Sequence, residues 1–436
     1  MVRNAFVSYF SAAVESVTAP YVNSNAANNF FIYPPVFCIV CKSMCIVCVA
    51  LVIISSMNKN IVIIGGGASA LMLASLLPEN TATIIESNPK LGAKILISGG
   101  GKCNITNKYM GSQYFIGDKT FVEASIDFFD EKSLLMWLEE RHLKPELRNG
   151  KHYFCKDSAK EILNIFTKES RNQKILLNEK VMEVTKRDDL FIVKTNKRTL
   201  TATHVVVASG GLSFPKIGAS PIGYEIAESF GHSVQKTAPG LVGFTVQKDQ
   251  FFFKELSGLS TDVEIKVGNA ICDGALLFAH KGISGPAVLD ASLYWEKGKI
   301  DIDFLPDFSL QSMRQSKKQI SSLLPLPKRL TKAFLIQLDL FDKTGNKLTS
   351  EDIQKLETLH SYSFAPAGTF GYAKAEVTKG GVSTDEINAY TMESKRVQGL
   401  FFTGEVLDVT GRLGGYNFQW AFSSAYTCAQ YIRGEN

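Results

Sequence analysis

The chain has 436 residues, of which 45% are hydrophobic and 20% are charged, and it contains 34 Gly and 14 Pro. This composition excludes fibrous and intrinsically disordered proteins, and the length favours two or three domains over one core. The net charge of +5 comes from 47 basic and 42 acidic residues without long runs of like charge, so the sequence predicts no nucleic-acid partner.

Residues 1–56 precede the first nucleotide-binding pattern and are predicted to be an extension outside the working domains. Residues 36–54 are nearly all apolar, with Lys42 as the one charge, and are about as long as a bilayer-spanning helix needs to be. Three interpretations stay open: a true translation start at Met57, an N-terminal membrane anchor, or a folded extension. The start at Met57 is favoured and predicts a cytoplasmic protein. Under the anchor interpretation, the membrane contact would be through residues 36–54.

Four of the eight cysteines crowd into the apolar stretch with C-x2-C-x3-C-x2-C spacing: Cys38, Cys41, Cys45 and Cys48. Such spacing can hold zinc or an iron–sulfur cluster. The residues around them are apolar, however, and offer no His or acidic side chain to orient thiolates. We therefore predict no metal. The other cysteines form no C-x-x-C pair, which disfavours a dithiol redox centre and fits a reducing compartment.

Residues 61–64 are all β-branched, which predicts a strand buried on both faces of a parallel sheet. Gly65, Gly67 and Ala70 then fit the G-x-G-x-x-G/A fingerprint, and residues 68–77 follow with helical apolar spacing. The first glycine permits the tight turn, and the second lets a pyrophosphate approach the backbone. The small Ala70 lets the helix pack on the strand with its positive end facing the phosphates.

A second strand is predicted at residues 81–85, and it ends at Glu86, 21 residues after Gly65. A carboxylate at this point accepts hydrogen bonds from a ribose diol and repels a 2′-phosphate. The pattern therefore predicts FAD or NAD rather than NADP at this site.

The segment at residues 89–107 favours FAD over NAD. It places Gly99, Gly100 and Gly101 before Lys102, Cys103 and Asn104, where backbone N–H groups and polar side chains can meet a flavin or its ribityl chain. Here the sequence resembles the bacterial flavoproteins of the HI0933-like group. Members are described as aminoacetone-oxidase-like proteins or NAD(P)/FAD-dependent oxidoreductases, and some reduce bile acids.

The resemblance runs from about Asn60 to the C-terminus and rests on five motifs in the order of the family: residues 97–104, 205–232, 274–292, 375–387 and 399–425. The second motif predicts a strand at 205–208, a turn at Ser209-Gly210-Gly211 against the adenosine or pyrophosphate half of FAD, and a helix at 223–231. It departs from the family at residues 220–222.

The third motif predicts a helix that starts at Ser284-Gly285-Pro286, with the serine as its cap and the proline in its first turn. His280 precedes this start and is a weak catalytic candidate, because imidazole titrates near neutral pH. A simple turn between a strand and a helix explains the same residues.

The last motif predicts a strand at 400–403 that ends at Gly404-Glu405, with Asp408 beyond it as an acceptor for the ribityl hydroxyls. Gly414, Gly415, Tyr416 and Asn417 then open a helix whose free N–H groups would face N1 and the C2 carbonyl of the flavin. A helix N-terminus there stabilises the negative charge of a reduced flavin. Leu413 stands where relatives often carry Thr.

The predicted fold is α/β: a Rossmann-type FAD-binding domain with an inserted β-barrel-like subdomain and a small helical subdomain. The FAD-binding domain is predicted at residues 57–238 and 364–436, the β-rich insertion at 239–308 and the helical insertion at 309–363. The predicted cofactor-binding residues are Gly65, Gly67, Ala68, Ser69, Ala70, Glu86, Lys94, Ser98, Gly99, Gly100, Gly101, Lys102, Cys103, Asn104, Ser209, Gly210, Gly211, Gly404, Glu405, Asp408, Gly414, Gly415, Tyr416 and Asn417.

The favoured function is an FAD-dependent oxidoreductase in which NAD(P)H reduces the flavin and a small molecule accepts the electrons. No second glycine fingerprint follows a strand, so NAD(P)H is expected to bind only transiently. Two alternatives stay open: an oxidase that acts on a small aminoketone and consumes oxygen, and a flavin-binding protein without turnover. The sequence fixes neither the acceptor nor the oligomeric state.

Overall fold

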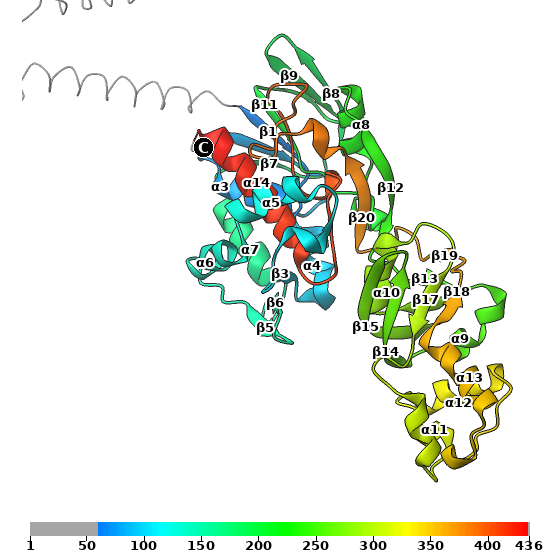
Figure 1. Ribbon diagram of the computed structural model, residues 1–436. Helices are drawn as coiled ribbons and strands as arrows, with labels where there is room; N and C mark the ends of the chain where they lie inside the picture. Colours follow the sequence, from blue (N-terminus) through cyan, green and yellow to red (C-terminus); the bar gives the residue numbers. More distant parts are fainter. Residues whose placement is uncertain (1–59, 435–436) are drawn as a thin grey trace, which may run out of the picture. The chain divides into compact units, whose positions relative to one another are not determined.

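The computed structural model describes residues 60–434 (Figure 1). The apolar stretch at 36–54, its four cysteines and Met57 therefore lie outside the described residues. Among the helices at 60–434, none combines the length and the apolar character that a membrane span requires.

A five-stranded sheet, parallel throughout, forms the centre of the nucleotide-binding part, in the order β21-β11-β1-β2-β7. The bounds are β1 Ile61–Ile64, β2 Ala82–Ile85, β7 Lys174–Leu176, β11 His204–Val207 and β21 Leu400–Phe402. All four residues of β1 are buried, because this strand lies between β2 and β11 and is covered on both faces. The four strands predicted for this sheet are confirmed to within one residue at each end.

Helices pack on this sheet through α3 (Ala68–Leu76), which contacts β1 and β2. The C-terminal helix α14 (Tyr416–Arg433) packs along α3, and α5 (Lys119–Phe128) packs on α14, as Figure 1 shows. The remaining helices of this part are α4 Ala93–Ile97, α6 Glu131–Glu139, α7 Lys160–Glu169 and α8 Ile222–Ser229. A single hydrophobic core joins these elements to the sheet.

Smaller antiparallel sheets complete the nucleotide-binding part. A three-stranded sheet, β10-β9-β8, contacts β11 through β9; its bounds are β8 Val181–Arg187, β9 Leu190–Thr195 and β10 Thr199–Ala202. A second has the order β3-β6-β5, with β3 at Asn104–Asn107, β5 at Glu146–Arg148 and β6 at His152–Phe154. Two pairs add to these: β4 (Phe115–Ile116) with β22 (Thr410–Gly411), and β12 (Val234–Gly240) with β20 (Val377–Val382).

The inserted part is built on a seven-stranded antiparallel sheet in the order β18-β17-β14-β15-β16-β13-β19. Its bounds are β13 Phe244–Thr245, β14 Ser260–Val267, β15 Ala270–Ala279, β16 Gly282–Ser284, β17 Ile300–Asp303, β18 Tyr362–Phe364 and β19 Gly368–Thr369. Helix α10 (Pro286–Tyr294) packs on β14 and β15. The edge strands β18 and β19 come from residues beyond 361, so the returning chain completes the sheet before it re-enters the nucleotide-binding part.

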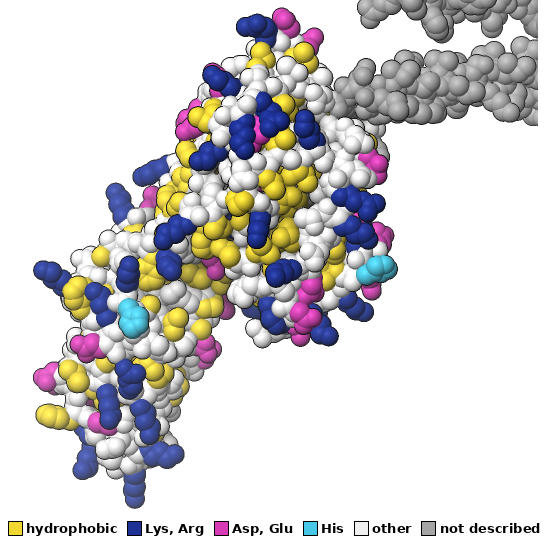
Figure 2. Space-filling model, turned by 180° about the vertical axis from the view of Figure 1, so that it is seen from behind, with side chains coloured by type: hydrophobic (Ala, Val, Ile, Leu, Met, Phe, Trp, Pro, Cys, Tyr) yellow, Lys and Arg dark blue, Asp and Glu magenta, His cyan; other side chains and the backbone are white. Residues whose placement is uncertain are grey.

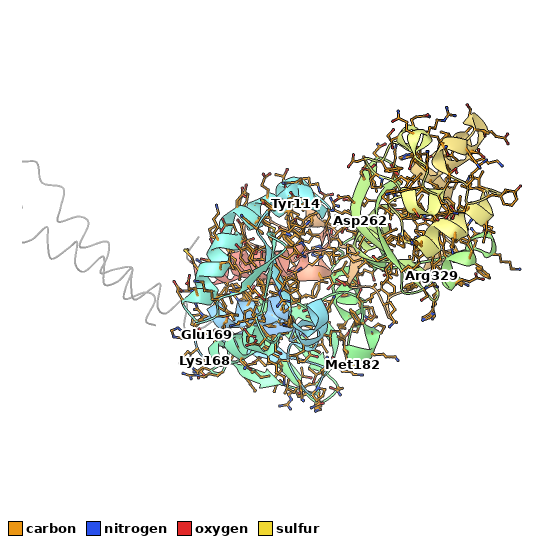
Figure 3. The ribbon with its side chains drawn as sticks, turned by 90° about the horizontal axis from the view of Figure 1, so that it is seen from below. Tyr114, Lys168, Glu169, Met182, Asp262 and Arg329 are labelled. Carbon is orange, nitrogen blue, oxygen red and sulfur yellow. The ribbon has the colours of Figure 1, made fainter. Side chains whose placement is uncertain are left out.

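Helices α11 (Ile320–Leu323), α12 (Lys328–Gln337) and α13 (Ser350–Glu357) follow the sheet strand β17. They share one hydrophobic core with the sheet, in which the rings of Phe304 and Phe334 lie 4.9 Å apart. The β-rich and helical segments are therefore packed together rather than on separate cores. Figure 3 labels Tyr114 and Met182 on the nucleotide-binding part, and Asp262 of β14 and Arg329 of α12 on the inserted part.

Candidate functional site

A cavity of about 860 Å³ opens where the strands of the parallel sheet end. Ile64 and Ile85, the last residues of β1 and β2, line it together with Ala208 after β11 and Thr403 after β21. This edge is where ligands bind in open α/β sheets, and the volume is near the upper end of the range for ligand pockets, about 300–1,000 Å³.

The fold brings most of the predicted cofactor-binding residues to this cavity. Those that line it are Gly65, Gly67, Ala68, Ser69, Glu86, Lys94, Ser98, Gly99, Gly100, Asn104, Ser209, Gly210, Gly211, Glu405, Gly414, Gly415 and Asn417. Those that do not are Ala70, Gly101, Lys102, Cys103, Gly404, Asp408 and Tyr416. Residues from five separate stretches of the chain therefore meet in one place.

The two glycines of the fingerprint, Gly65 and Gly67, are there for different structural reasons. Gly65 has φ +109°, and a Cβ atom there would lie 2.5 Å from the carbonyl oxygen of Ala208, so the turn itself requires glycine. A Cβ atom on Gly67 would meet no atom within 4 Å. Gly67 precedes α3 without a side-chain cap, so the N–H groups of the first turn of α3 are available to a phosphate.

The Glu86 carboxylate is fixed at the end of β2. Its Oε2 accepts a hydrogen bond from Gly66 N at 2.7 Å, and its Oε1 accepts from Asn88 N and Nδ2 at 2.7 and 2.8 Å. The side chain is largely buried yet lines the cavity. The Oγ of Ser87 also donates to Oε1, at 3.2 Å, so the acid braces the turn after β1 while its side chain forms part of the cavity wall.

The segment after α4 provides a second backbone cradle. Gly99 and Gly100 have positive φ values of 55° and 65°, and a Cβ atom on Gly100 would meet nothing within 4 Å. The Oδ1 atom of Asn104 is buried and has no hydrogen-bond partner within residues 60–434, while its Nδ2 lies 3.3 Å from Nδ1 of His152. An unpartnered buried acceptor at a cavity wall fits a ligand that donates a hydrogen bond there.

Lys94 and Glu405 form an ion pair of 2.6 Å across the cavity wall. The other oxygen of Glu405 accepts from Thr378 N at 2.8 Å. Glu405 lies in a one-turn helix, η9 (Gly404–Val406), which turns its side chain to the cavity and carries Asp408 away from it. Glu405 therefore lines the cavity, whereas Asp408, which was predicted to lie beside it as an acceptor, does not.

Helix α14 begins after Gly415 with no side-chain cap, so its first N–H groups are free as predicted. A Cβ atom on Gly415 would lie 2.7 Å from the carbonyl oxygen of Thr106, which explains the glycine. The side chain of Asn417 binds Gly411 N and O at 2.9 and 2.8 Å and shapes the loop at the cavity wall. Tyr416 stacks on Tyr114 instead, with ring centroids 4.8 Å apart.

Three other predicted residues make contacts within the protein and do not line the cavity. Lys102 points away and donates to the carbonyl oxygen of Lys156 at 3.1 Å. Cys103 is fully buried, and burial raises the pKa of its thiol to about 12, so it is a neutral thiol near neutral pH. Ala70 is buried in α3, where its small side chain lets the helix approach the sheet, as the fingerprint predicts.

Two predictions for the third motif need correction. His280 is exposed in the turn between β15 and β16 and does not line the cavity, so its position gives it no contact with a ligand there. The helix starts at Pro286 as expected, but its N-cap is Gly285 with φ +95° and no side-chain cap, whereas Ser284 belongs to β16. A side chain on Gly285 would collide with the carbonyl oxygen of Ala275 at 2.5 Å.

The cavity also contains residues that were not among the predicted site residues. His152 and Phe154 reach it from β6, and Leu241, Glu376 and Leu413 line another part of the wall. The Glu376 carboxyl accepts no hydrogen bond within the described chain. Burial by the surrounding walls raises its pKa, against the lowering effect of Lys94. The only local signal for Glu376 was its place in the 375–387 motif.

The residues present fit FAD. The uncapped start of α3 and the open space at Gly67 suit a pyrophosphate, and Glu86 suits a ribose. The open space at Gly100, the unpartnered Oδ1 of Asn104 and the uncapped start of α14 suit a polar ring system. These features lie along one continuous cavity, as an extended dinucleotide requires.

Comparison with known proteins agrees with this geometry. The family described as "HI0933-like protein Rossmann domain" matches residues 59–431. A Haemophilus influenzae protein named "Ribosomal RNA dihydrouridine synthase" is 37% identical over 87% of this chain and 99% of its own length. An Escherichia coli protein of the same name is 38% identical over 85% and 96%. A Clostridium scindens "3-dehydro-bile acid delta(4,6)-reductase" is 29% identical over 85% and 98%.

Proposed function

The chain belongs to the HI0933-like family of FAD-binding oxidoreductases, and from this premise we propose that it reduces a carbon–carbon double bond that is conjugated to a carbonyl group. NAD(P)H is the proposed reductant, and the proposed substrate is a uridine of ribosomal RNA. The overall reaction consumes NAD(P)H, one proton and uridine, and yields NAD(P)⁺ and dihydrouridine.

The names of the relatives support this type of bond as the one that is reduced. Dihydrouridine is uridine whose C5–C6 double bond is saturated, and that bond is conjugated to the C4 carbonyl. A 3-dehydro bile acid with double bonds at positions 4 and 6 is a conjugated dienone. Relatives with different substrates in their names thus share one kind of reaction, hydride addition to an electron-poor alkene.

The identities favour uridine as the substrate. The two relatives named for ribosomal RNA are 37% and 38% identical to this chain, against 29% for the relative named for a bile acid. The sequence pattern by itself favoured a small-molecule acceptor without nucleic acid. A uracil ring is itself a small acceptor, so both proposals place a compact conjugated ring in the same cavity.

The observation that carries the proposal is that one cavity extends from the fingerprint turn to Glu376. Bound FAD supplies hydride transfer between NAD(P)H and the alkene. Leu241, Val377 and Leu413 give the wall near Glu376 an apolar lining that excludes water. The Glu376 carboxyl, whose pKa is raised by burial, is the proposed donor of the proton that the second alkene carbon needs.

The test uses the purified FAD-loaded protein under anaerobic conditions. NADH and NADPH are added separately, and loss of flavin absorbance near 450 nm reports reduction. Unmodified ribosomal RNA transcripts, or the free nucleoside uridine, are then added. Dihydrouridine is quantified by mass spectrometry, after digestion where the substrate is RNA. Recovery of absorbance together with dihydrouridine supports the proposal. A reduced flavin that no transcript reoxidises, that yields no dihydrouridine and that is reoxidised only when oxygen is admitted afterwards contradicts the proposal and favours an oxidase.

A further inference from the structure

The sheet β3-β6-β5 and its flanking residues carry a concentrated positive charge. Residues 102–109 and 144–156, here called the basic sheet, contain one acidic residue, Glu146, and the basic residues Lys102, Lys108, Lys144, Arg148, Lys151 and Lys156. Their net charge of +5 equals that of the entire chain, so the remaining 415 residues sum to zero. These 21 residues are therefore one place in the chain where positive charge is concentrated.

The fold creates this concentration from two distant stretches of chain. β3 pairs with β6 so that Asn107 lies opposite His152, and Lys108 N donates to Lys151 O at 2.8 Å. The hydrogen bond from Arg148 lowers the pKa of Glu146, and the charges of Lys102 and Lys156 lower it further. The charges of Arg148, Lys102 and Lys156 thus act on one carboxylate, although no run of like charge marks them in the sequence.

Three of these lysines are exposed and free of acidic partners. Lys108, Lys151 and Lys156 are exposed, and within the described residues none of them forms an ion pair. Unpaired ammonium groups beside the strands of this sheet are available to phosphates.

The basic sheet is continuous with the wall of the cavity. His152 and Phe154 alternate with Tyr153 along β6, and both line the cavity with their rings nearly parallel, 6.5 Å apart. The Arg148 guanidinium lies 5.1 Å from the Phe154 ring. Aromatic and guanidinium planes beside free lysines are the usual means by which proteins hold an unstacked RNA base and its backbone.

A second basic region, at residues 309–363, is less suitable for holding a substrate that must reach the cavity. Residues 309–363 carry nine basic and five acidic residues, and Figure 2 shows Lys and Arg side chains over the end of the inserted part formed by α11–α13. None of these residues lines the cavity. A substrate that must deliver a base to the cavity is better held at the basic sheet.

We infer that the basic sheet docks the phosphate backbone of an RNA substrate and places one unpaired base at the mouth of the cavity beside His152 and Phe154. This inference rests on the proposed function for the identity of the reacting base. The docking itself requires no turnover, so binding can be measured with the oxidised FAD-loaded protein.

The test compares two triple variants with equal changes in charge. The first carries Lys108→Glu, Lys151→Glu and Lys156→Glu. The control carries Lys174→Glu, Lys197→Glu and Lys297→Glu, three exposed lysines that do not line the cavity. Binding of in vitro transcribed large-subunit and small-subunit ribosomal RNA is measured from 50 to 300 mM salt. FAD absorbance and thermal unfolding verify that both variants are folded.

The first variant is expected to weaken RNA binding and to reduce the slope of log Kd against log salt by about 2 to 3, since each lost phosphate contact removes about 0.7 to 0.9. The control should keep the wild-type slope. Equal effects of both variants, or competition by polyglutamate as strong as that by RNA, would overturn the inference.

The two proposals can fail separately. If RNA binding depends on the three lysines but no dihydrouridine forms, the docking inference holds and the proposed reaction is wrong. If the basic-sheet variant makes dihydrouridine as well as the control variant does, the docking inference is wrong and the proposed reaction stands.

Discussion

The Oε2 atom of Glu86 accepts a hydrogen bond of 2.7 Å from the backbone N–H of Gly66, so the acid that ends β2 holds the turn that follows β1. The carboxylate links two neighbouring strand ends at the point where the cavity begins. One side chain therefore shapes the predicted phosphate-binding turn and faces the predicted ribose.

Replacing Glu86 by Gln should raise the Kd of the apoprotein for FAD by about ten- to a hundredfold. Hydrogen bonds to a charged group contribute about 1.5–3 kcal/mol, and Gln keeps the shape while removing the charge. Fluorescence titration with FAD measures the change. Glu123→Gln, at an exposed position on α5, is the matched control and should bind FAD normally. An unchanged Kd in Glu86→Gln would exclude the carboxylate from cofactor binding.

Substitutions of the two fingerprint glycines should have different effects on FAD binding and on stability. Gly67→Val places its side chain in open cavity space, so the apoprotein should keep its unfolding temperature while FAD binding is lost. Gly65→Val forces a branched side chain to φ +109° and against the carbonyl of Ala208. It should destabilise the apoprotein by about 1–3 kcal/mol from backbone strain alone.

Thermal unfolding of the two apoproteins distinguishes these outcomes, because bound FAD would itself raise the stability of the wild type. The assignment of roles is wrong if Gly67→Val unfolds at a much lower temperature than the wild-type apoprotein, or if it retains FAD on purification.

Local patterns were sufficient to predict the first half of the site. The buried run at 61–64, the glycines after it, α3 and the acid at 86 follow one another directly, and each has a steric or electrostatic requirement that the sequence reveals. The structure places this unit as predicted.

The rest of the site depends on contacts between distant segments. His152 and Phe154 enter the cavity only because β6 pairs with β3, about 45 residues earlier. Glu405 lies in the single turn of η9 and lines the cavity, whereas Asp408 beyond that turn does not, and no periodicity in the sequence shows this turn. The charge of the basic sheet is likewise not marked by a run in the sequence, because β3 and β6 bring its two segments together.

Acid stability should depend on Glu386. Its Oε1 accepts from Arg396 Nη2 at 2.6 Å, its Oε2 accepts from Ser233 N at 2.9 Å, and these bonds lower its pKa from 4.5 to about 2. A lowered folded-state pKa gives stability that is complete above about pH 4.5 and is lost as the pH falls toward 2. Glu386→Gln should be less stable at pH 7 and should approach the wild type as the pH falls through this window.

Urea unfolding at a series of pH values, followed by tryptophan fluorescence, measures this difference. Glu228→Gln, an exposed acid on the neighbouring helix α8, is the control and should follow the wild-type curve. A constant gap between Glu386→Gln and wild type from pH 7 to pH 3 would mean that Glu386 stabilises the fold by packing rather than by its charge.

The proposed proton donor gives the sharpest test of the chemistry. Glu376 faces the cavity, and burial raises its pKa, with Lys94 lowering it and Asp290 raising it further. Glu376→Gln keeps the size of the side chain and removes the proton. Reduction of bound FAD by NAD(P)H should be unchanged, whereas formation of dihydrouridine should fall by about 100-fold or more, the usual contribution of a general acid. Stopped-flow measurement of the two half-reactions separates these effects.

The raised pKa of Glu376 predicts the direction in which the rate of product formation changes with pH. The protonated carboxyl is the active form, so the wild-type rate of product formation should decline as the pH rises through the raised pKa of Glu376, and this decline should be absent in Glu376→Gln. Glu225→Gln, which also lines the cavity, should retain both half-reactions and the wild-type pH profile. An equal loss of both half-reactions in Glu376→Gln would assign the residue to cofactor binding and would require another proton donor, for which His152, which also lines the cavity, is a candidate.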